Sequence, residues 1–199
     1  SKISIKNKII IKEAFMVRYH PQWQWIKKKI KDGFVGDVHS TQSVFCYNNR
    51  DKSNIRNIKD YGGGGLYDIG CYPIVISRYL LDKEPTKVIG IANYDKNFKV
   101  DILTSGILDF KGITSTFTVS TQSTLNQKVT IIGSKKTLVL ENPFNANPNL
   151  NTTIIIYDGK SIYRKDNKIK NIKASDQYEN QVNVFSNHLL KNKKIDYGL

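Results

Sequence analysis

The chain has 199 residues, of which 39% are hydrophobic and 24% charged, a composition typical of one globular domain with a real core. This composition excludes a mainly disordered protein. No apolar run approaches the roughly 18 residues of a membrane span, and the first residues lack the apolar stretch of a secretory signal, so we expect a cytoplasmic location. Cys46 and Cys71 are too few for a disulfide framework, and the histidines show no ligand spacing with them, so we expect free thiols and no metal site.

A formal charge of +14 indicates nucleic-acid binding only where the basic residues cluster. The densest basic runs lie at residues 27–31, 135–136, 165–173 and 191–194, scattered along the chain and without a recognition motif. A solvated basic surface is the preferred interpretation, and nucleic-acid binding is kept as the minor alternative. We therefore expect neither nucleic acid nor a membrane as a partner.

The first predicted element is a buried strand at residues 8–16, an apolar run bounded by polar sequence and typical of a parallel sheet. Because a lone parallel strand cannot bury both of its faces, we predict that a preceding parallel α/β domain is absent from this chain. A short amphipathic helix at residues 22–32 is stopped by Gly33, and alternating polarity predicts a strand at residues 38–47. The polar loop at residues 48–60 follows and can overhang a site.

The most specific feature is a run of four glycines that ends with Gly64 and Gly65. Glycine backbone adopts positive φ angles and allows a ligand to approach closely, so these two residues are candidate substrate contacts. The helix predicted at residues 66–81 places Asp68 and Tyr72 one turn apart on one face, beside the glycine loop. The spacing predicts an acid/base pair that faces a cavity.

Strand-like segments follow in quick succession, and short connectors between them predict a large, mostly antiparallel sheet. These segments lie at residues 86–92, 100–109, 113–121, 128–133, 137–140, 153–157 and 161–164. The asparagine-rich stretch at residues 142–151 is the predicted flexible loop, and Asp176 is the predicted N-cap of a last helix with an apolar stripe. The predicted fold class is α+β, an open-faced sheet with helices packed on one face.

Several segments together resemble one protein family. They are residues 13–22 (EAFMVRYHPQ), 33–38 (GFVGDV), 62–74 (GGGGLYDIGCYPI), 129–134 (VTIIGS), 142–144 (NPF) and 176–181 (DQYENQ). The set is similar to the second domain of the glucose-fructose oxidoreductase and inositol dehydrogenase family (Gfo/Idh/MocA). The resemblance implies that residues 1–199 form a single substrate and oligomerisation domain. It also implies a homo-oligomer through the open sheet and an N-terminal Rossmann domain, outside this chain, that binds NAD or NADP.

In that family the glycine motif supplies an aspartate that contacts substrate and, four residues on, a histidine or tyrosine that exchanges the substrate hydroxyl proton. The resemblance places these roles on Asp68 and Tyr72 and implies a sugar or polyol dehydrogenase. A phenol with a pKa of about 10 is a poor base unless a cation stabilises its anion, and in the family a lysine of a Glu-Lys-Pro motif in the first domain lies in the site. This sequence has neither that motif nor a Gly-x-Gly-x-x-Gly loop, so the chain alone is expected to be inactive.

Alternatives remain open for each candidate residue. Tyr72 is compatible with a core aromatic role, and Asp68 with a helix cap that also contacts substrate. Arg18 and His20, which follow the first predicted strand, are candidate substrate contacts or structural residues. Arg56 is a candidate donor to substrate hydroxyls or phosphate, or a solvated loop residue. For the whole chain, the alternative to an oxidoreductase domain is a non-catalytic binding or assembly module that retains the fold.

Overall fold

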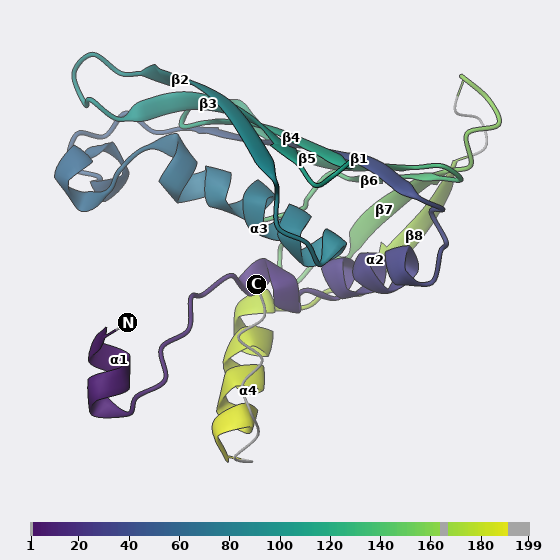
Figure 1. Ribbon diagram of the computed structural model, residues 1–199, viewed down its shortest axis with the longest axis horizontal. Coiled ribbons are helices and arrows are strands. Elements are labelled where there is room, and N and C mark those ends of the chain that lie inside the picture. Colours follow the sequence, from purple (N-terminus) through teal and green to yellow (C-terminus); the bar gives the residue numbers. More distant parts are fainter. Residues whose placement is uncertain (1, 164–166, 191–199) are drawn as a thin grey trace.

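A computed structural model describes residues 2–163 and 167–190 and is built on one eight-stranded sheet (Figure 1). Across the sheet the order is β2 (Lys87–Tyr94), β3 (Asp101–Asp109), β4 (Thr114–Ser120), β1 (Val38–Asn48), β5 (Gln122–Gly133), β6 (Thr137–Leu140), β7 (Thr152–Tyr157) and β8 (Lys168–Ile172). All neighbours pair antiparallel except β1 and β4, which pair parallel. The predicted α+β class, with its large and mostly antiparallel sheet, is confirmed.

Two helices, α2 (Pro21–Lys31) and α3 (Cys71–Leu81), lie on one side of this sheet (Figure 1). The helix predicted at residues 22–32 is thus confirmed, and it begins with Pro21 at a position where a missing N–H costs nothing. Trp23 and Ile26 of α2 and Ile76 of α3 are almost fully buried against the sheet residues. The apolar faces of these two helices therefore form the core of the domain.

The opposite face of the sheet is open across β2 to β6. A shallow hollow of about 750 Å³ lies on this face. Figure 1 shows α2 and α3 on the other side of the sheet. Ile89 and Ile91 of β2 and Ile107 of β3 line it and are exposed. A single domain seldom leaves a contiguous apolar surface of this kind uncovered.

The buried strand predicted at residues 8–16 is wrong for this chain. A short helix, α1 (Lys2–Asn7), is followed by irregular backbone up to the 3-10 turn η1 (Met16–Tyr19). Ile9, Ile10 and Ile11 are between 41% and 56% exposed. An apolar run becomes a strand only where a neighbouring strand takes up its hydrogen bonds, and the eight-stranded sheet does not include this segment.

Two details near the end of the sheet also differ from expectation. Residues 161–163 are not strand, and the rest of the strand predicted there lies outside the described residues. The last strand is instead β8, an edge strand in which Lys168 and Lys170 remain in solvent. Charged edge strands of this type carry no clear apolar alternation, which is why the sequence pattern did not indicate it.

The predicted flexible loop at residues 142–151 contains one of the most buried side chains in the chain, Phe144. Its ring stacks on Phe45 with the ring centroids 5.0 Å apart. The indole N–H of Trp23 donates to the carbonyl oxygen of Pro143 at 2.7 Å, so the loop is fixed to α2. The prediction of a flexible loop is therefore wrong at this point. The polar residues around Phe144 gave no indication that its side chain belongs to the core.

The last helix, α4 (Gln177–Leu190), begins as predicted. Oδ1 of Asp176 accepts the backbone N–H groups of Tyr178 and Glu179 at 2.8 and 3.2 Å, an N-cap that satisfies donors of the first turn. Figure 1 shows α4 directed away from the sheet, and its Asn180 side chain donates to the carbonyl oxygen of Tyr19 in η1. The apolar stripe of α4, which includes exposed Tyr178 and Val182, is therefore not buried against the sheet.

Candidate functional site

The glycine run is a packing point between the loop before it and strand β3. The N–H of Gly64 donates to the carbonyl oxygen of Arg56 at 2.9 Å, which ties the loop that carries Arg56 to the glycines. Gly64 has a φ of +123°, and a Cβ there would overlap Oδ1 of Asp101. A Cβ on Gly65 would also crowd Asp101, at 3.3 Å from Oδ2. The glycines thus bring protein backbone close to a buried carboxylate of the protein itself.

Asp101 is a residue that the sequence interpretation missed. Its Oδ2 accepts the backbone N–H of Leu66 at 2.7 Å and the hydroxyl of Thr104 at 2.6 Å. Leu66 begins η4 (Leu66–Gly70), a π-helical turn that runs directly into α3. Asp101 therefore serves as the acceptor that starts the helical segment of the site, a role usually filled by the residue just before the helix.

Asp68 lies in the π-helical turn and Tyr72 in the first turn of α3, so they are not separated by one regular α-helical turn as predicted. π-helical turns often mark functional positions. Pro73 lies in the same first turn of α3, close behind the π-helical turn, and supplies no backbone N–H there. Asp68 and Tyr72 nevertheless both line one cavity of about 350 Å³, so the structure brings the predicted pair together.

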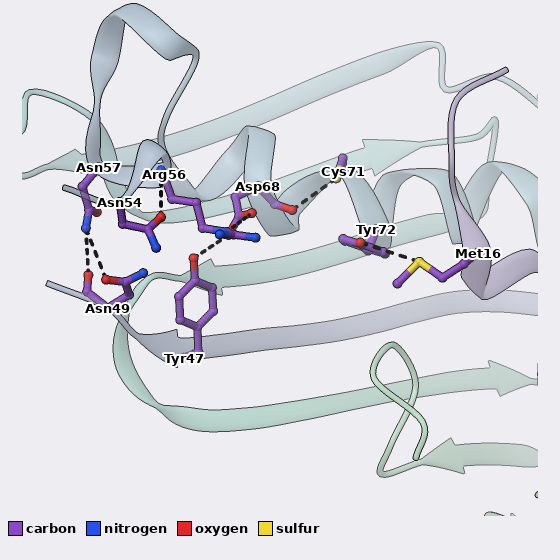
Figure 2. A network of polar contacts seen from close by, with 9 residues as sticks. All are labelled: Met16, Tyr47, Asn49, Asn54, Arg56, Asn57, Asp68, Cys71 and Tyr72. Atoms are coloured by element: carbon purple, nitrogen blue, oxygen red, sulfur yellow. Dashed lines mark hydrogen bonds and ion pairs between the residues drawn. The ribbon is translucent and has the colours of Figure 1, made fainter. Parts of the chain in front are cut away.

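Both carboxylate oxygens of Asp68 accept hydrogen bonds from other elements (Figure 2). Nε of Arg56, in the short 3-10 turn η2 (Ile55–Asn57), donates to Oδ1 at 2.8 Å. The hydroxyl of Tyr47, near the end of β1, donates to Oδ2. The sequence interpretation did not select Tyr47, although it has the same parity as Phe45 in a strand whose alternation was recognised.

The cavity is walled by seven separate segments of the chain. Beyond the acid/base pair its lining consists of Met16, Phe45, Tyr47, Asn49, Arg56, Ile69, Leu125, Asn145 and Tyr178. The Tyr72 hydroxyl is 3.8 Å from the sulfur of Met16, a weak acceptor, and the Tyr72 ring lies 5.8 Å from those of Phe45 and Phe144. The lining therefore combines aromatic rings with a few polar side chains, an arrangement typical of small-molecule sites.

Burial controls the protonation of the phenols in this cavity. Burial is the main cause that raises the pKa of Tyr72 to about 12, with smaller contributions from the nearby Cys71, Tyr178 and Asp68. Burial and the hydrogen bond to Asp68 also raise the pKa of Tyr47. At neutral pH both phenols are protonated, so Tyr72 is a hydrogen-bond donor in this arrangement and becomes a base only where added positive charge lowers its pKa.

The two remaining candidates lie away from the cavity. His20 is fully buried, its Nδ1 accepts the N–H of Gln22 at 3.2 Å as the N-cap of α2, and burial lowers its pKa. The guanidinium of Arg18 lies over the ring of Tyr79, 5.2 Å from the centroid. Neither residue lines the cavity that contains Asp68 and Tyr72.

None of the described helices is long and apolar enough to cross a membrane. Within the same described residues, no three histidine, cysteine, aspartate or glutamate side chains gather in a group that could hold a metal ion.

The open sheet with helices on one face matches the fold of dehydrogenase C-terminal domains. Residues 23–139 match the profile of the GFO/IDH/MocA C-terminal domain. The chain is 38% identical over 177 residues to an uncharacterized oxidoreductase, ORF334, of Rhizobium meliloti, a match that covers 88% of this chain and 53% of the relative. The chain therefore belongs to the GFO/IDH/MocA family.

Other relatives are more distant. The dTDP-3,4-didehydro-2,6-dideoxy-alpha-D-glucose 3-reductase of Actinomadura kijaniata is 25% identical over 137 residues, which is 68% of this chain and 41% of that protein. The chain thus spans about half the length, or less, of the curated relatives that it matches.

Two solved structures share the fold. KijD10, a 3-ketoreductase from Actinomadura kijaniata in complex with NADP and TDP-benzene, aligns with a TM-score of 0.88 at 20% identity, over 99% of this chain and 60% of that one. The aldose-aldose oxidoreductase from Caulobacter crescentus, complexed with glycerol, aligns with a TM-score of 0.84 at 19% identity, over 98% of this chain and 58% of that one.

Proposed function

We propose that this chain is the substrate and oligomerisation domain of an NAD(P)-dependent oxidoreductase that acts on a sugar or related polyol. Tyr72 exchanges the proton of the reacting hydroxyl, and Asp68 orients the substrate. The observation that carries the proposal is the presence of Asp68, Tyr72 and Arg56 in one cavity that is lined by aromatic and polar side chains.

The proposed reaction needs a proton carrier at the alcohol oxygen. NAD or NADP supplies the hydride acceptor or donor when it is bound. The chain has no Gly-x-Gly-x-x-Gly loop, so we assign cofactor binding mainly to a preceding Rossmann domain of the same polypeptide. Within the cavity the phenol of Tyr72 takes the hydroxyl proton as an alcohol is oxidised, or gives a proton to the oxygen as a ketone is reduced.

The charge balance of the cavity favours a neutral, hydroxyl-rich substrate. The positive charge of Arg56 is paired with Asp68, so these two residues present hydrogen-bond donors and acceptors with little net charge. The other polar lining residues are the amides Asn49 and Asn145 and the neutral phenols Tyr47 and Tyr178. A nucleotide-linked sugar is the second candidate substrate, because a curated relative is a reductase of a dTDP-linked sugar and a guanidinium at the rim also suits phosphate.

The elevated pKa of Tyr72 is a further reason, beside the missing nucleotide-binding loop, to expect no activity from this chain alone. A phenol with a pKa of about 12 is protonated in all but a tiny fraction of molecules at neutral pH. In the proposed enzyme a lysine of the preceding domain stabilises the phenolate and lowers the pKa of Tyr72.

For the open face of the sheet we propose a second copy of the chain as its cover. Exposed Ile89 and Ile91 are the anchors of this interface, and Val88 points to the opposite face of the same strand. The full-length protein is expected to be at least a dimer in light scattering, with Ile89→Lys shifting it towards monomer and the matched Val88→Lys leaving the dimer intact. A monomer at high protein concentration would contradict this assignment.

The experiment that tests the function uses the full-length gene product. NADH and NADPH absorbance is followed against free sugars, polyols and nucleotide-linked sugars, for the parent protein and for Tyr72→Phe. Loss of a general acid/base costs about 10²- to 10⁴-fold in rate, so the variant is expected to lose at least about 100-fold in kcat without loss of folding. The control is Tyr67→Phe, which changes an exposed phenol in the same helical segment.

Two outcomes would overturn the proposal. A parent protein that turns over while Tyr72→Phe keeps its rate would remove the proton step from Tyr72. A full-length protein that binds neither nucleotide would favour the alternative, a non-catalytic binding or assembly module that retains the fold.

A further inference from the structure

We propose that Tyr47 is a positioning residue of this site, which acts with Arg56 to hold the carboxylate of Asp68 in one orientation towards the substrate. The inference rests on the proposed function, in which Asp68 contacts the substrate. It adds a residue that does not touch the reacting atoms and acts only through Asp68.

The first support is that Asp68 is held at both oxygens by different elements (Figure 2). Arg56 donates to Oδ1 from a loop, and Tyr47 donates to Oδ2 from β1. A carboxylate has about four lone-pair sites, so two hydrogen bonds fix its plane and still leave acceptor capacity for substrate hydroxyls. The Asp68 side chain is only 18% exposed, which limits competition from water.

The second support is an irregularity of the sheet at Tyr47. Cys46 pairs with Asn126 and Asn48 pairs with Gln122, so Tyr47 lies opposite three residues of β5, 123–125, in a bulge. The extra residues belong to β5, and irregularities of this kind are frequent beside active sites. One of the bulged residues, Leu125, lines the same cavity. The regular ladder is thus interrupted where the Tyr47 side chain is directed at Asp68.

The third support is the difference in rigidity between the two donors. Both neighbours of Tyr47 in β1 are paired, Cys46 with β4 and β5 and Asn48 with β5, whereas Arg56 lies in a connecting loop and its side chain is 47% exposed. Among the described residues, the terminal Nη atoms of Arg56 have no hydrogen-bond acceptor, so they are available to a ligand. Tyr47 then supplies the fixed contact to Asp68, and Arg56 supplies a contact that also reaches the substrate.

The test is the kinetics of Tyr47→Phe in the full-length enzyme, with Tyr67→Phe as the matched control on an exposed phenol. Loss of one hydrogen bond to a charged group corresponds to about a tenfold to hundredfold loss, which we expect in kcat/KM. The affinity for NAD or NADP is expected to stay unchanged, because Tyr47 affects only the binding of the substrate. An unchanged kcat/KM in a folded variant would overturn the proposal.

A double-mutant cycle separates positioning from a general effect on folding. In an Asp68→Ala background, Tyr47→Phe is expected to cause no further loss, since the group that it positions is gone. Additive losses would overturn the proposal. If Tyr47→Phe does not fold, Tyr47→His takes its place in the same cycle, because the shorter imidazole ring cannot place a donor where the phenol hydroxyl reaches Oδ2 of Asp68.

The outcome is distinguishable from failure of the proposed function. If Tyr72→Phe and Asp68→Ala lose activity while Tyr47→Phe does not, the oxidoreductase site stands and the positioning role of Tyr47 is wrong. If Tyr72→Phe and Asp68→Ala both keep full activity, the proposed function itself fails at this cavity.

Discussion

Oδ2 of Asp101 accepts the backbone N–H of Leu66 at 2.7 Å, so a carboxylate on β3 holds the first residue of the turn that carries Asp68. The same oxygen accepts the Thr104 hydroxyl at 2.6 Å, and the Asp101 residue is 9% exposed. With two donors on one oxygen, this carboxylate is an anchor for the cavity wall. It joins the sheet to the helical segment that contributes Asp68 and Tyr72.

Asp101→Ala is expected to lower the free energy of unfolding by about 1–3 kcal/mol, because it leaves two donors without an acceptor in a buried place. Urea denaturation followed by circular dichroism measures this. The matched control is Asp60→Ala, which changes an exposed aspartate in the loop before the glycines and is expected to stay within about 0.5 kcal/mol. Equal effects of the two variants would contradict the anchoring role of Asp101.

Gly64→Ala is expected to destabilise the protein more than Gly112→Ala. Both glycines have positive φ, which costs alanine about 1–2 kcal/mol, but a Cβ meets nothing within 4 Å at Gly112 and overlaps Asp101 at Gly64. Overpacking adds roughly 1–3 kcal/mol at Gly64. Denaturant midpoints of the two variants measure the difference, and identical midpoints would show that the contact with Asp101 is unimportant.

Phe144→Ala is expected to cost about 3–5 kcal/mol, the usual range for removal of a buried aromatic ring. The ring is fully buried and stacks on Phe45, so its loss leaves a cavity under Tyr72. Leu150→Ala, an exposed position in the same loop, is expected to stay within about 0.5 kcal/mol. Thermal or urea unfolding of both variants distinguishes a core residue from a residue of a flexible loop.

Tyr72 is expected to titrate near pH 12 in this chain, because burial raises its pKa to about 12 from an ordinary value of 10. A group whose pKa is higher in the folded state stabilises the fold below pH 10, and this contribution is lost as the pH rises from 10 to 12. Absorbance titration of the phenolate, compared with Tyr72→Phe, measures the pKa. Unfolding at each pH should show a smaller alkaline loss of stability in the variant.

The same titration also tests the proposed role of the preceding domain. In the full-length protein the phenolate of Tyr72 is expected to form at lower pH than in this chain, since a cation in the site stabilises the anion. Identical titration in both proteins would contradict the proposed lysine contribution.

Site residues that lie in a recognisable local motif could be predicted from the sequence. Residues whose hydrogen-bond partners lie far away in the chain could not. Asp68 and Tyr72 were found because a glycine run precedes them, and the cap of α4 because Asp176 stands directly before an apolar stripe. Asp101 has no such signal, since its partner Leu66 is 35 residues away in the chain.

Tyr47 shows the limit of pattern reading within a correctly predicted strand. Alternation places it on the same face as Phe45, but alternation does not indicate its hydrogen bond with Asp68, which lies 21 residues away in the chain. At residues 8–16 the error is a strand that was predicted but does not form. The apolar composition of this segment is that of a buried strand, yet composition alone supplies no neighbour to pair with.

The pairing of β1 also determines when the site can form during folding. Phe45 pairs with Val119 of β4 and with Gln127 of β5, both of which are synthesised long after it. Contacts of such high sequence separation form slowly, because a long loop must be closed first. A nascent chain that ends before β5 therefore contains the glycine run, Asp68 and Tyr72 but has no partner strand to set the bulge at Tyr47. The geometry of the cavity is consequently a late product of folding.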